Sequence, residues 1–330
     1  MTVLVTGGAG YIGSHMVLAL IDRGEDVVVL DNLSTGFDWA VLPPARLVAG
    51  DIGDGGFVRG VLTDNKIEAI VHFAGSIVVP DSVTDPLGYY LNNTVKSRAL
   101  IEAAVACGVR RFIFSSTAAV YGMPKANPVR EDAVLDPISP YGSSKMMTEI
   151  MLRDTAFAHD FNYVALRYFN VAGADPKGRS GQSTPRATHL IKVASEAALG
   201  KRGHLDVYGT DYDTPDGTCI RDYIHVSDLA NAHLLALDHL LANAEDLVMN
   251  CGYGRGFSVL EVIDAVKRVS GVDFEVRMAD RRAGDPAALV AGADRVRERL
   301  GWQPQREKLD LIVEDALNWE ERLKTRNATG

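Results

Sequence analysis

The chain has 330 residues, 47% of them apolar and 23% charged, as expected of a globular protein with an ample hydrophobic core. A formal net charge of -9 argues against nucleic acid or an acidic membrane as the main partner, and three scattered cysteines indicate a reducing compartment and no structural metal. The chain starts in a predicted strand and has no apolar run of membrane length, so we expect a cytoplasmic protein without a signal peptide.

The first half of the chain alternates short β-branched runs with amphipathic stretches. Helical patterns lie between the runs, and the longest covers 89–108 and ends at a glycine, which commonly stops a helix. This alternation predicts an α/β fold with a doubly wound parallel sheet of the Rossmann type. The runs that predict buried strands are residues 3–6, 27–30, 70–74, 112–116 and 163–169.

The periodic pattern breaks down at 171–185, where Gly, Pro and polar residues predict a loop. We therefore divide the chain there, into a Rossmann domain over 1–172 and a smaller mixed α/β substrate domain over 173–330. The strand-like run 247–252 can return to the first sheet, so we assign segment 225–252 to the Rossmann domain. Other elements predicted in the second part are a helix at 187–200, a strand at 205–209 and a helix at 227–242.

The segment "VTGGAGYIGSH" (5–15) carries a glycine-rich pattern between the first strand and the first helix. Gly8, Gly10 and Gly13 fit G-x-G-x-x-G, and Gly7 adds a second register. Bare backbone lets a pyrophosphate approach, and the helix N-terminus supplies N–H donors and a positive dipole. Asp31, at the end of the next strand, can accept from both adenosine-ribose hydroxyls and would repel a 2′-phosphate, so NAD is favoured over NADP.

Each of these residues also has a purely structural alternative. Glycines in a tight turn, followed by a capping aspartate, would give a similar pattern, although the strand and helix around them favour a nucleotide site. Asp51, in "GDI" after the third strand, can meet the adenine edge or can be an ordinary turn aspartate.

Tyr141 and Lys145 lie four residues apart on a predicted helix and so share one face. Thr117 lies just beyond the strand that we expect to end at Ser115, at the carboxyl edge where α/β sheets bind ligands. To act as a base near pH 7, a phenol must lower its pKa by about three units, or ~4 kcal/mol. A unit charge at ~4 Å and an effective dielectric of ~20 supplies about that. We therefore predict that Lys145 lowers the pKa of Tyr141 and that Thr117 binds the same substrate hydroxyl; the alternative is a surface Tyr and Lys.

Ten short segments, spread over nearly the whole chain, carry a family resemblance. They are "VTGGAGYIGSH", "LDNLSTG", "GDI", "HFAG", "YYLNNT", "FIFSSTAAVYG", "SPYGSSK", "LRYFNVAGA", "DGTCIRDYIHVSDLA" and "RRAGD". With them the sequence resembles the extended short-chain dehydrogenase/reductase family and, more narrowly, the UDP-glucose 4-epimerases. The first and seventh segments define the superfamily, and the sixth, eighth, ninth and tenth are specific to the epimerase branch.

The resemblance implies an enzyme that interconverts UDP-glucose and UDP-galactose, with NAD as its cofactor. Tyr141 takes the proton of the sugar 4-hydroxyl while hydride passes from C4 to NAD. The resulting 4-keto sugar is held only through its nucleotide and swings over, and the hydride returns to its opposite face, which inverts C4. Because each cycle regenerates NAD, the cofactor should stay bound.

The functional positions of the family carry over residue by residue. Asn170 matches a contact to a sugar-proximal oxygen, or it is a loop-capping amide. Arg221 and Arg282 can fork onto the diphosphate, and Asp285 can accept from the uridine ribose. The catalytic positions are Tyr141, Lys145 and Thr117. The cofactor positions are Gly7, Gly10, Tyr11, Ile12, Gly13, Asp31, Asn32, Ser34, Thr35, Gly36, Asp51, Ile52, Phe73, Ala74, Gly75, Asn92, Tyr141, Lys145 and Phe169. The substrate positions are Thr117, Tyr141, Asn170, His189, Leu190, Arg221, Arg282 and Asp285.

The sequence departs from the family pattern at four positions. Thr117 replaces a serine and keeps the hydroxyl. Ile77 stands where many members have a lysine, so one charged contact to the cofactor is lost. His189 replaces an asparagine, and it either donates to a phosphate or is a structural histidine. Leu289 falls where some members carry a bulky tyrosine, and a smaller side chain there predicts a secondary activity on UDP-N-acetylhexosamines.

Three alternative functions remain open at this point. A nucleotide-sugar 4,6-dehydratase would need an acid and a base after Thr117, where Ala118 and Ala119 stand. A 4-epimerase of a UDP-pentose or a UDP-uronic acid would share the same motifs. An NAD-sensing regulator would share the fold but would have no need of Tyr141, Lys145 and Thr117 together.

Two helices also predict a partner subunit. The patterns at 88–106 and 141–158 are more apolar than one core face requires, which is explained either by core packing or by an interface. In the family the equivalent helices pair, so the resemblance implies a homodimer, with a UDP-sugar as the other partner and neither nucleic acid nor membrane. The apolar residues in question include Met146, Met147, Ile150 and Met151.

Overall fold

A computed structural model describes residues 1–185, 187–243, 245–282 and 284–326 of the chain. Its centre is a sheet of seven strands in the order β10-β6-β5-β4-β1-β2-β3, and every neighbouring pair is parallel. The predicted doubly wound parallel sheet is therefore confirmed. The strands are β1 (Thr2–Thr6), β2 (Asp26–Asp31), β3 (Arg46–Ala49), β4 (Ala69–His72), β5 (Arg111–Thr117), β6 (Asn162–Tyr168) and β10 (Leu247–Cys251).

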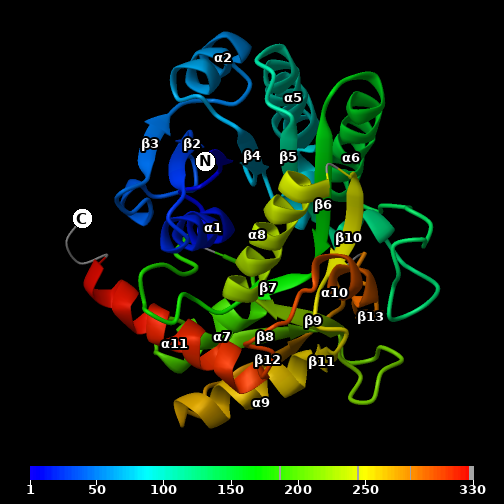
Figure 1. Ribbon diagram of the computed structural model, residues 1–330. Coiled ribbons are helices and arrows are strands. Elements are labelled where there is room, and N and C mark those ends of the chain that lie inside the picture. Colours follow the sequence, from blue (N-terminus) through cyan, green and yellow to red (C-terminus); the bar gives the residue numbers. More distant parts are fainter. Residues whose placement is uncertain (186, 244, 283, 327–330) are drawn as a thin grey trace.

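Helices cover both faces of this sheet because its strands are apolar on both sides. In β1, Val3 and Val5 pack into the cluster beneath α1 and α8, whereas Leu4 points to the opposite face, beneath α2, α5 and α6. Figure 1 shows α1 and α8 lying side by side on the first face. The bounds are α1 (Tyr11–Asp22), α2 (Gly55–Asp64), α5 (Lys96–Ala106), α6 (Pro140–Ala158) and α8 (Val226–Asn243).

The connection from β4 to α5 contains an irregular helical segment. Two short helices, α3 (Val79–Thr84) and α4 (Pro86–Tyr89), lead into a π-helical turn over Tyr90–Val95, which continues as α5. The predicted helix at 89–108 is thus present, but its first part is wider than an α-helix. Such wide turns commonly occur at functional sites.

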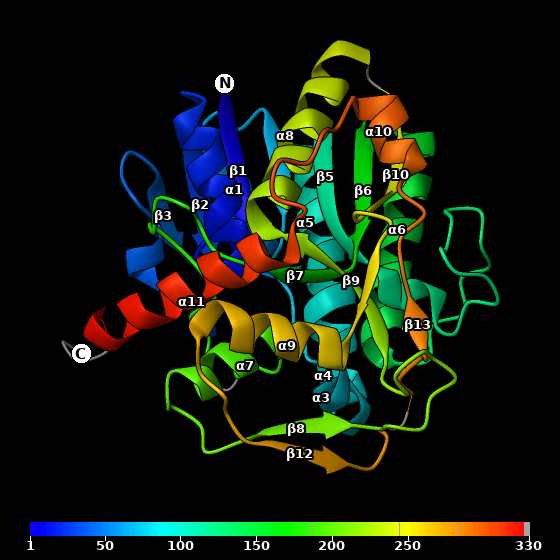
Figure 2. The same cartoon turned by 90° about the horizontal axis from the view of Figure 1, so that it is seen from below.

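A smaller set of elements lies beyond the carboxyl ends of the central strands. Two small sheets form there: β9 pairs with β7, β11 and β13, and β8 pairs with β12 (Figure 2). The strands are β7 (Asn170–Ala172), β8 (Leu205–Tyr208), β9 (Ile220–His225), β11 (Gly256–Ser258), β12 (Val276–Ala279) and β13 (Ala288–Leu289). The helices are α7 (Leu190–Ala198), α9 (Val259–Ser270), α10 (Asp294–Leu300) and α11 (Leu309–Arg326).

Two sequence-based boundaries need correction, and one strand was missed. The strand that we expected to end at Ser115 continues to Thr117, which pairs with Tyr168 of β6. The helix expected from residue 187 begins at Leu190, because His189 has an extended backbone and is the N-cap. β9 was not predicted at all. The run 247–252 does return to the first sheet as β10, next to β6; the division of the chain near residue 172 stays a prediction. Within the residues that the structure describes, no helix is long and apolar enough to span a bilayer.

Candidate active site

The glycine-rich turn is formed by close backbone contacts that exclude side chains. Gly7 has a φ of +71°, and a Cβ on it would lie 2.6 Å from the backbone nitrogen of Ala74. A Cβ on Gly13 would lie 2.1 Å from the Gly7 carbonyl oxygen. Gly10 is the N-cap of α1 and provides no side chain to occupy the first N–H groups of the helix. The turn therefore leaves bare backbone and no capping side chain at the start of α1, as an anion site requires.

Asp31 joins this turn to the loop that follows β2. One carboxylate oxygen accepts from the Ala9 backbone N–H at 3.0 Å, and the other accepts from Leu33 at 2.8 Å. Each oxygen keeps a second lone pair for a ribose hydroxyl. Asn32 orders the same loop by accepting from the Ser34 backbone, and the backbone at Gly36 lies against Ala9. A small recess beside the turn is lined by residues of the turn, of the loop after β2 and of the loop before α7. They include Gly10, Tyr11, Thr35, Phe37, Trp39, Ser180, Gly181, Ser183 and Thr184.

Asp51 lies next to a cation that sequence reasoning did not single out. Lys96 of α5 donates to the Asp51 carboxylate at 2.5 Å, and the Gly53 backbone donates at 2.7 Å. Burial alone would raise the pKa of Asp51, but these donors, together with Asn32, hold it below its usual value. Ile52 is buried beside it.

The "HFAG" turn after β4 is tied to the π-helical turn by two adjacent asparagines. Asn92, a predicted cofactor residue, donates to the Ser76 hydroxyl at 2.9 Å. Asn93, which was not predicted, accepts from the Ser76 backbone N–H at 2.7 Å and donates to the Ser144 hydroxyl at 3.0 Å. Asn93 thereby connects the turn at Gly75 to α6. The doubled asparagine in "YYLNNT" was the available signal.

The three predicted catalytic residues converge at the carboxyl end of β5. Ser139 caps α6 by accepting from the Gly142 backbone, and Tyr141 and Lys145 lie on the buried face of this helix. Tyr141 and Thr117 are each 8% exposed, and the Thr117 hydroxyl is close enough to the phenol to lower the pKa of Tyr141. Lys145 donates from Nζ to the Ser115 carbonyl oxygen at 3.0 Å, and a Cβ on Gly75 would lie 3.6 Å from the same nitrogen.

The electrostatics of this group differ from our expectation. Burial raises the pKa of Tyr141, and the hydrogen bond with Thr117 offsets part of that rise. The prediction that Lys145 lowers the Tyr141 pKa in the protein alone is therefore wrong. The physical reason is that the ammonium points to the Ser115 carbonyl and is itself desolvated, which lowers its own pKa to about 8.

The predicted substrate residues lie on the smaller elements. Arg221 on β9 approaches Asp285, with 3.4 Å between Nη2 and Oδ1. Asn170 on β7 pairs in register with Tyr223 of β9, two residues beyond Arg221 on the same strand. His189 precedes α7, contacts Gln182 at 3.3 Å through Nδ1, and has its pKa lowered by burial.

Arg282 and Leu289 have neighbours that the sequence did not reveal. The Arg282 guanidinium stacks 3.7 Å from the centre of the Tyr208 ring. Leu289 lies opposite Arg221 in the β13–β9 register and packs against the cluster that contains Ala118. Leu289 is therefore close to both the diphosphate candidate and the residue that follows Thr117.

A doubly wound parallel sheet, a glycine-rich turn at its first crossover and a Tyr-x-x-x-Lys pair beside the strand-end hydroxyl define a short-chain dehydrogenase/reductase. The chain belongs to the NAD dependent epimerase/dehydratase family, whose model matches residues 3–252. It is thus an enzyme with NAD as its cofactor, and the family expected from the sequence is confirmed.

Individual relatives narrow the similarity further. The chain is 59% identical to the UDP-glucose 4-epimerase of Azospirillum brasilense, over 98% of this chain and 92% of that protein. The solved UDP-glucose 4-epimerase from Brucella ovis in complex with NAD is 45% identical, with a TM-score of 0.93 over 96% of this chain and 97% of that one. The UDP-Glc/GlcNAc 4-epimerase of Campylobacter jejuni is 50% identical, with a TM-score of 0.85 over 97% and 99% of the two chains.

Proposed function

We propose that this protein interconverts UDP-glucose and UDP-galactose by transient oxidation at C4, with NAD retained throughout. The observation that carries the proposal is the burial of Tyr141, Thr117 and Lys145 together at the end of β5, where Lys145 donates to the Ser115 carbonyl oxygen. The similarity to named UDP-glucose 4-epimerases over nearly the whole chain supports the choice of substrate.

The residues present fit the dinucleotide. The turn at Gly7, Gly10 and Gly13 excludes any Cβ where a pyrophosphate would approach, and Asp31 retains lone pairs for the adenosine ribose. Lys145 has two further N–H donors for the second ribose. The remaining residues that we propose to hold NAD are Tyr11, Ile12, Asn32, Ser34, Thr35, Gly36, Asp51, Ile52, Phe73, Ala74, Gly75, Asn92, Tyr141 and Phe169.

In the reaction that we propose, residues of the chain accept one proton from the substrate and later return it. The chemistry that NAD supplies when bound is the reversible acceptance of the C4 hydride. Tyr141 accepts the 4-hydroxyl proton at its phenolic oxygen and gives it back after the sugar has turned. Thr117, which acts on the pKa of Tyr141, aligns the same hydroxyl. Because burial raises the Tyr141 pKa, the proton transfer depends on this alignment and on charge brought into the site by binding.

We assign the nucleotide end of the substrate to the smaller elements. Arg221 and Arg282 bind the diphosphate, since guanidinium forks match phosphate oxygens. Asp285, already 3.4 Å from Arg221, accepts from the uridine ribose. Asn170 holds an oxygen near the sugar. His189 and Leu190 complete the set at the start of α7.

Replacing Tyr141 by Phe tests the function. We expect kcat for UDP-galactose to fall by about 10²- to 10⁴-fold, because the phenolic oxygen moves the proton. NAD released on denaturation, measured by absorbance and mass, should stay at the wild-type level. Tyr163→Phe, which alters another buried tyrosine in β6, is the matched control and should keep full activity.

Two other results would contradict the proposal. Substantial turnover by Tyr141→Phe would show that Tyr141 is not the base of the reaction. Wild-type turnover of a UDP-pentose or a UDP-uronic acid, without turnover of UDP-glucose, would move the protein to the alternative substrate class. Deuterium placed at C4 should remain in the product rather than exchange with solvent.

We further propose a secondary activity on UDP-N-acetylhexosamines. Leu289 lies beside Arg221 and against the cluster next to Thr117, so its size limits the space near the sugar. We expect turnover of UDP-N-acetylglucosamine by the wild type, and a loss of about 10-fold or more in Leu289→Tyr with UDP-glucose turnover retained. Coupled assays with both sugars decide; no turnover of the acetylated sugar by the wild type ends the proposal.

The homodimer also stays a proposal. An apolar row on α4 and the π-helical turn, Leu87, Leu91 and Val95, is 78%, 55% and 52% exposed. It lies beside Met147 and Ile150 of α6, as the contact of Thr94 with Met147 shows. An exposed apolar face of this kind is typically buried against a partner.

We likewise expect a reducing compartment such as the cytoplasm, because all three cysteines are unpaired.

A further inference from the structure

A buried ion pair lies behind the catalytic residues and takes no part in the proposed reaction. Glu149 is on α6, one and two turns beyond Lys145 and Tyr141, and Arg167 is on β6. Their side chains are 7% and 6% exposed. The guanidinium donates from Nε to one carboxylate oxygen at 2.9 Å and from Nη2 to the other at 2.6 Å, which is the bidentate geometry.

The pair is the centre of a wider polar network. Ser116, which precedes Thr117 and pairs with Arg167 in the β5–β6 register, donates its hydroxyl to Glu149. Arg167 donates from Nη1 to the Tyr121 hydroxyl at 2.9 Å, and Tyr121 donates to the Asn250 side chain at 2.7 Å. The network therefore ties α6 to three neighbouring strands, β5, β6 and β10.

Stability is a poor explanation for such a pair. Removing two charges from water costs free energy, and apolar replacements of buried ion pairs are often neutral or stabilising. A bidentate pair instead fixes position, because both of its hydrogen bonds can form in only one register of α6 against the strands. The element that it fixes carries Tyr141 and Lys145, and the strand that it fixes carries Thr117.

We infer that Glu149 and Arg167 are positioning residues of the reaction, which set the register of α6 on β5 and thereby the distance between the Tyr141 and Thr117 hydroxyls. This inference rests on the proposed function, since it concerns the group that moves the proton. The hydrogen bonds that the structure describes for these two side chains reach Ser116 and Tyr121, which are not among the substrate or cofactor positions. Their effect on turnover passes through Tyr141.

The test is the double variant Glu149→Met/Arg167→Met, which removes both charges and keeps the volume. We expect a folded protein with wild-type NAD content and a KM for UDP-galactose within a few-fold of wild type, but with kcat lowered about 10- to 100-fold, the cost of a small misplacement of reacting groups. The rising limb of kcat against pH should move to higher pH as the bond to Thr117 loosens. Arg167→Lys, which keeps the charge without the fork, should be intermediate.

A second buried pair serves as the matched control. Lys192 and Glu320 join α7 to α11 and are 9% and 3% exposed. Lys192→Met/Glu320→Met should leave kcat unchanged. Wild-type kcat in a folded Glu149→Met/Arg167→Met variant would overturn the inference and leave the proposed function standing; an inactive wild type would instead reject the function. If the double variant does not fold, Tyr121→Phe decides: a lowered kcat at unchanged KM supports the inference, and wild-type kcat overturns it.

Discussion

At the scale of single residues, Tyr141 shows how two opposing effects set a proton affinity. Burial disfavours the phenolate and raises the pKa of Tyr141, whereas the hydrogen bond with Thr117 favours the phenolate and lowers it. Lys145, with its own pKa lowered to about 8, is still protonated at neutral pH. Among the described residues, Thr117 thus supplies the hydroxyl that lowers the pKa of Tyr141.

Replacing Thr117 by Val should separate these effects. Without the hydrogen bond the pKa of Tyr141 rises further, so the deprotonated form that accepts the proton requires a higher pH. We expect kcat to fall about 10- to 100-fold and its rising limb to shift to higher pH, measured as a full pH profile. Thr117→Ser retains the hydroxyl and should behave as the wild type. An unshifted profile in Thr117→Val would contradict this account.

The sequence predicted residues that have a motif and missed those whose partners are distant along the chain. Tyr141, Lys145 and Thr117 do meet, because a helix face and a strand end are readable from spacing. Lys96 meets Asp51 across 45 positions, and such a contact has no local pattern. The direction of the Tyr141 pKa could not be predicted either, since it depends on burial and on where the Lys145 ammonium points.

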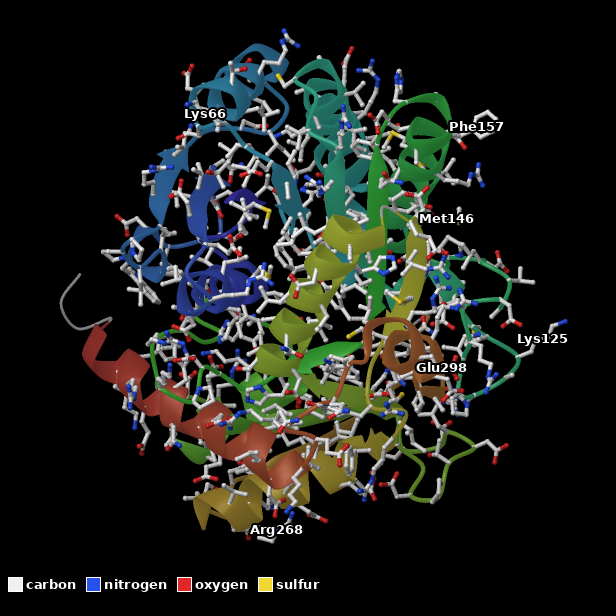
Figure 3. All side chains as sticks on the ribbon, viewed as in Figure 1. Lys66, Lys125, Met146, Phe157, Arg268 and Glu298 are labelled. Atoms are coloured by element: carbon white, nitrogen blue, oxygen red, sulfur yellow. The ribbon has the colours of Figure 1, made fainter. Side chains whose placement is uncertain are left out.

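At the scale of elements, α6 has two different faces. Its inner face holds Tyr141, Lys145 and the buried Glu149, and its outer face exposes Met147 and Ile150. Figure 3 shows Phe157 at the far end of the same helix, pointing away from the sheet. The outer face continues onto the π-helical turn, whose Asn92 and Asn93 face inward to Ser76. One pair of neighbouring elements therefore supports both the site and the exposed apolar row.

A charge in that row tests the dimer. Leu91→Asp places a carboxylate at the centre of the face, where burial against a partner would leave it without a counter-ion. We expect the wild type to sediment as a dimer at micromolar concentration and the variant as a monomer. Met278→Asp, at a 59% exposed apolar residue on β12, is the control and should not change the mass. A monomeric wild type would reject the homodimer.

Element prediction succeeded where burial on both faces makes a strand uniformly apolar. It failed at β9, where "IRDYIH" mixes Arg221 and Asp222 with apolar residues. Asp222 is buried there because it accepts from the Tyr253, Gly254 and Ala291 backbone N–H groups. In the sequence, a charged residue whose hydrogen bonds come from distant backbone N–H groups cannot be distinguished from a surface residue. The π-helical turn was missed for a similar reason, since its extra residue is fixed by tertiary contacts.

At the scale of the whole molecule, several buried histidines make the fold sensitive to acid. Burial lowers the pKa of His72 to about 3 and those of His15 and His233 to about 4. His72 is held between the Thr6 and Ser97 hydroxyls, at 2.7 and 2.8 Å. In the unfolded chain each would titrate near pH ~6.5. The unfolded state therefore binds more protons between these values, and stability falls as the pH falls.

Each of these histidines should lower the unfolding free energy by about 2 kcal/mol when the pH falls from 7.5 to 5. The stabilising contribution is fully present above the unfolded pKa and is lost as the pH falls toward the folded pKa. His233→Asn should reduce the loss by about that amount, measured by urea unfolding at both pH values. Equal pH dependence of His233→Asn and wild type would contradict the assignment.

The order of the strands also constrains how this chain can fold during its synthesis on the ribosome. β10 closes one side of the central sheet next to β6, although 78 residues separate the end of β6 from the start of β10. Until that late segment emerges, β6 presents an unpaired edge, and exposed edges recruit other chains. A nascent or truncated product that stops near residue 172 therefore exposes the edge of β6. That edge can be covered only after residues 173–246, which include α7, β8, β9 and α8, have left the exit tunnel and β10 follows.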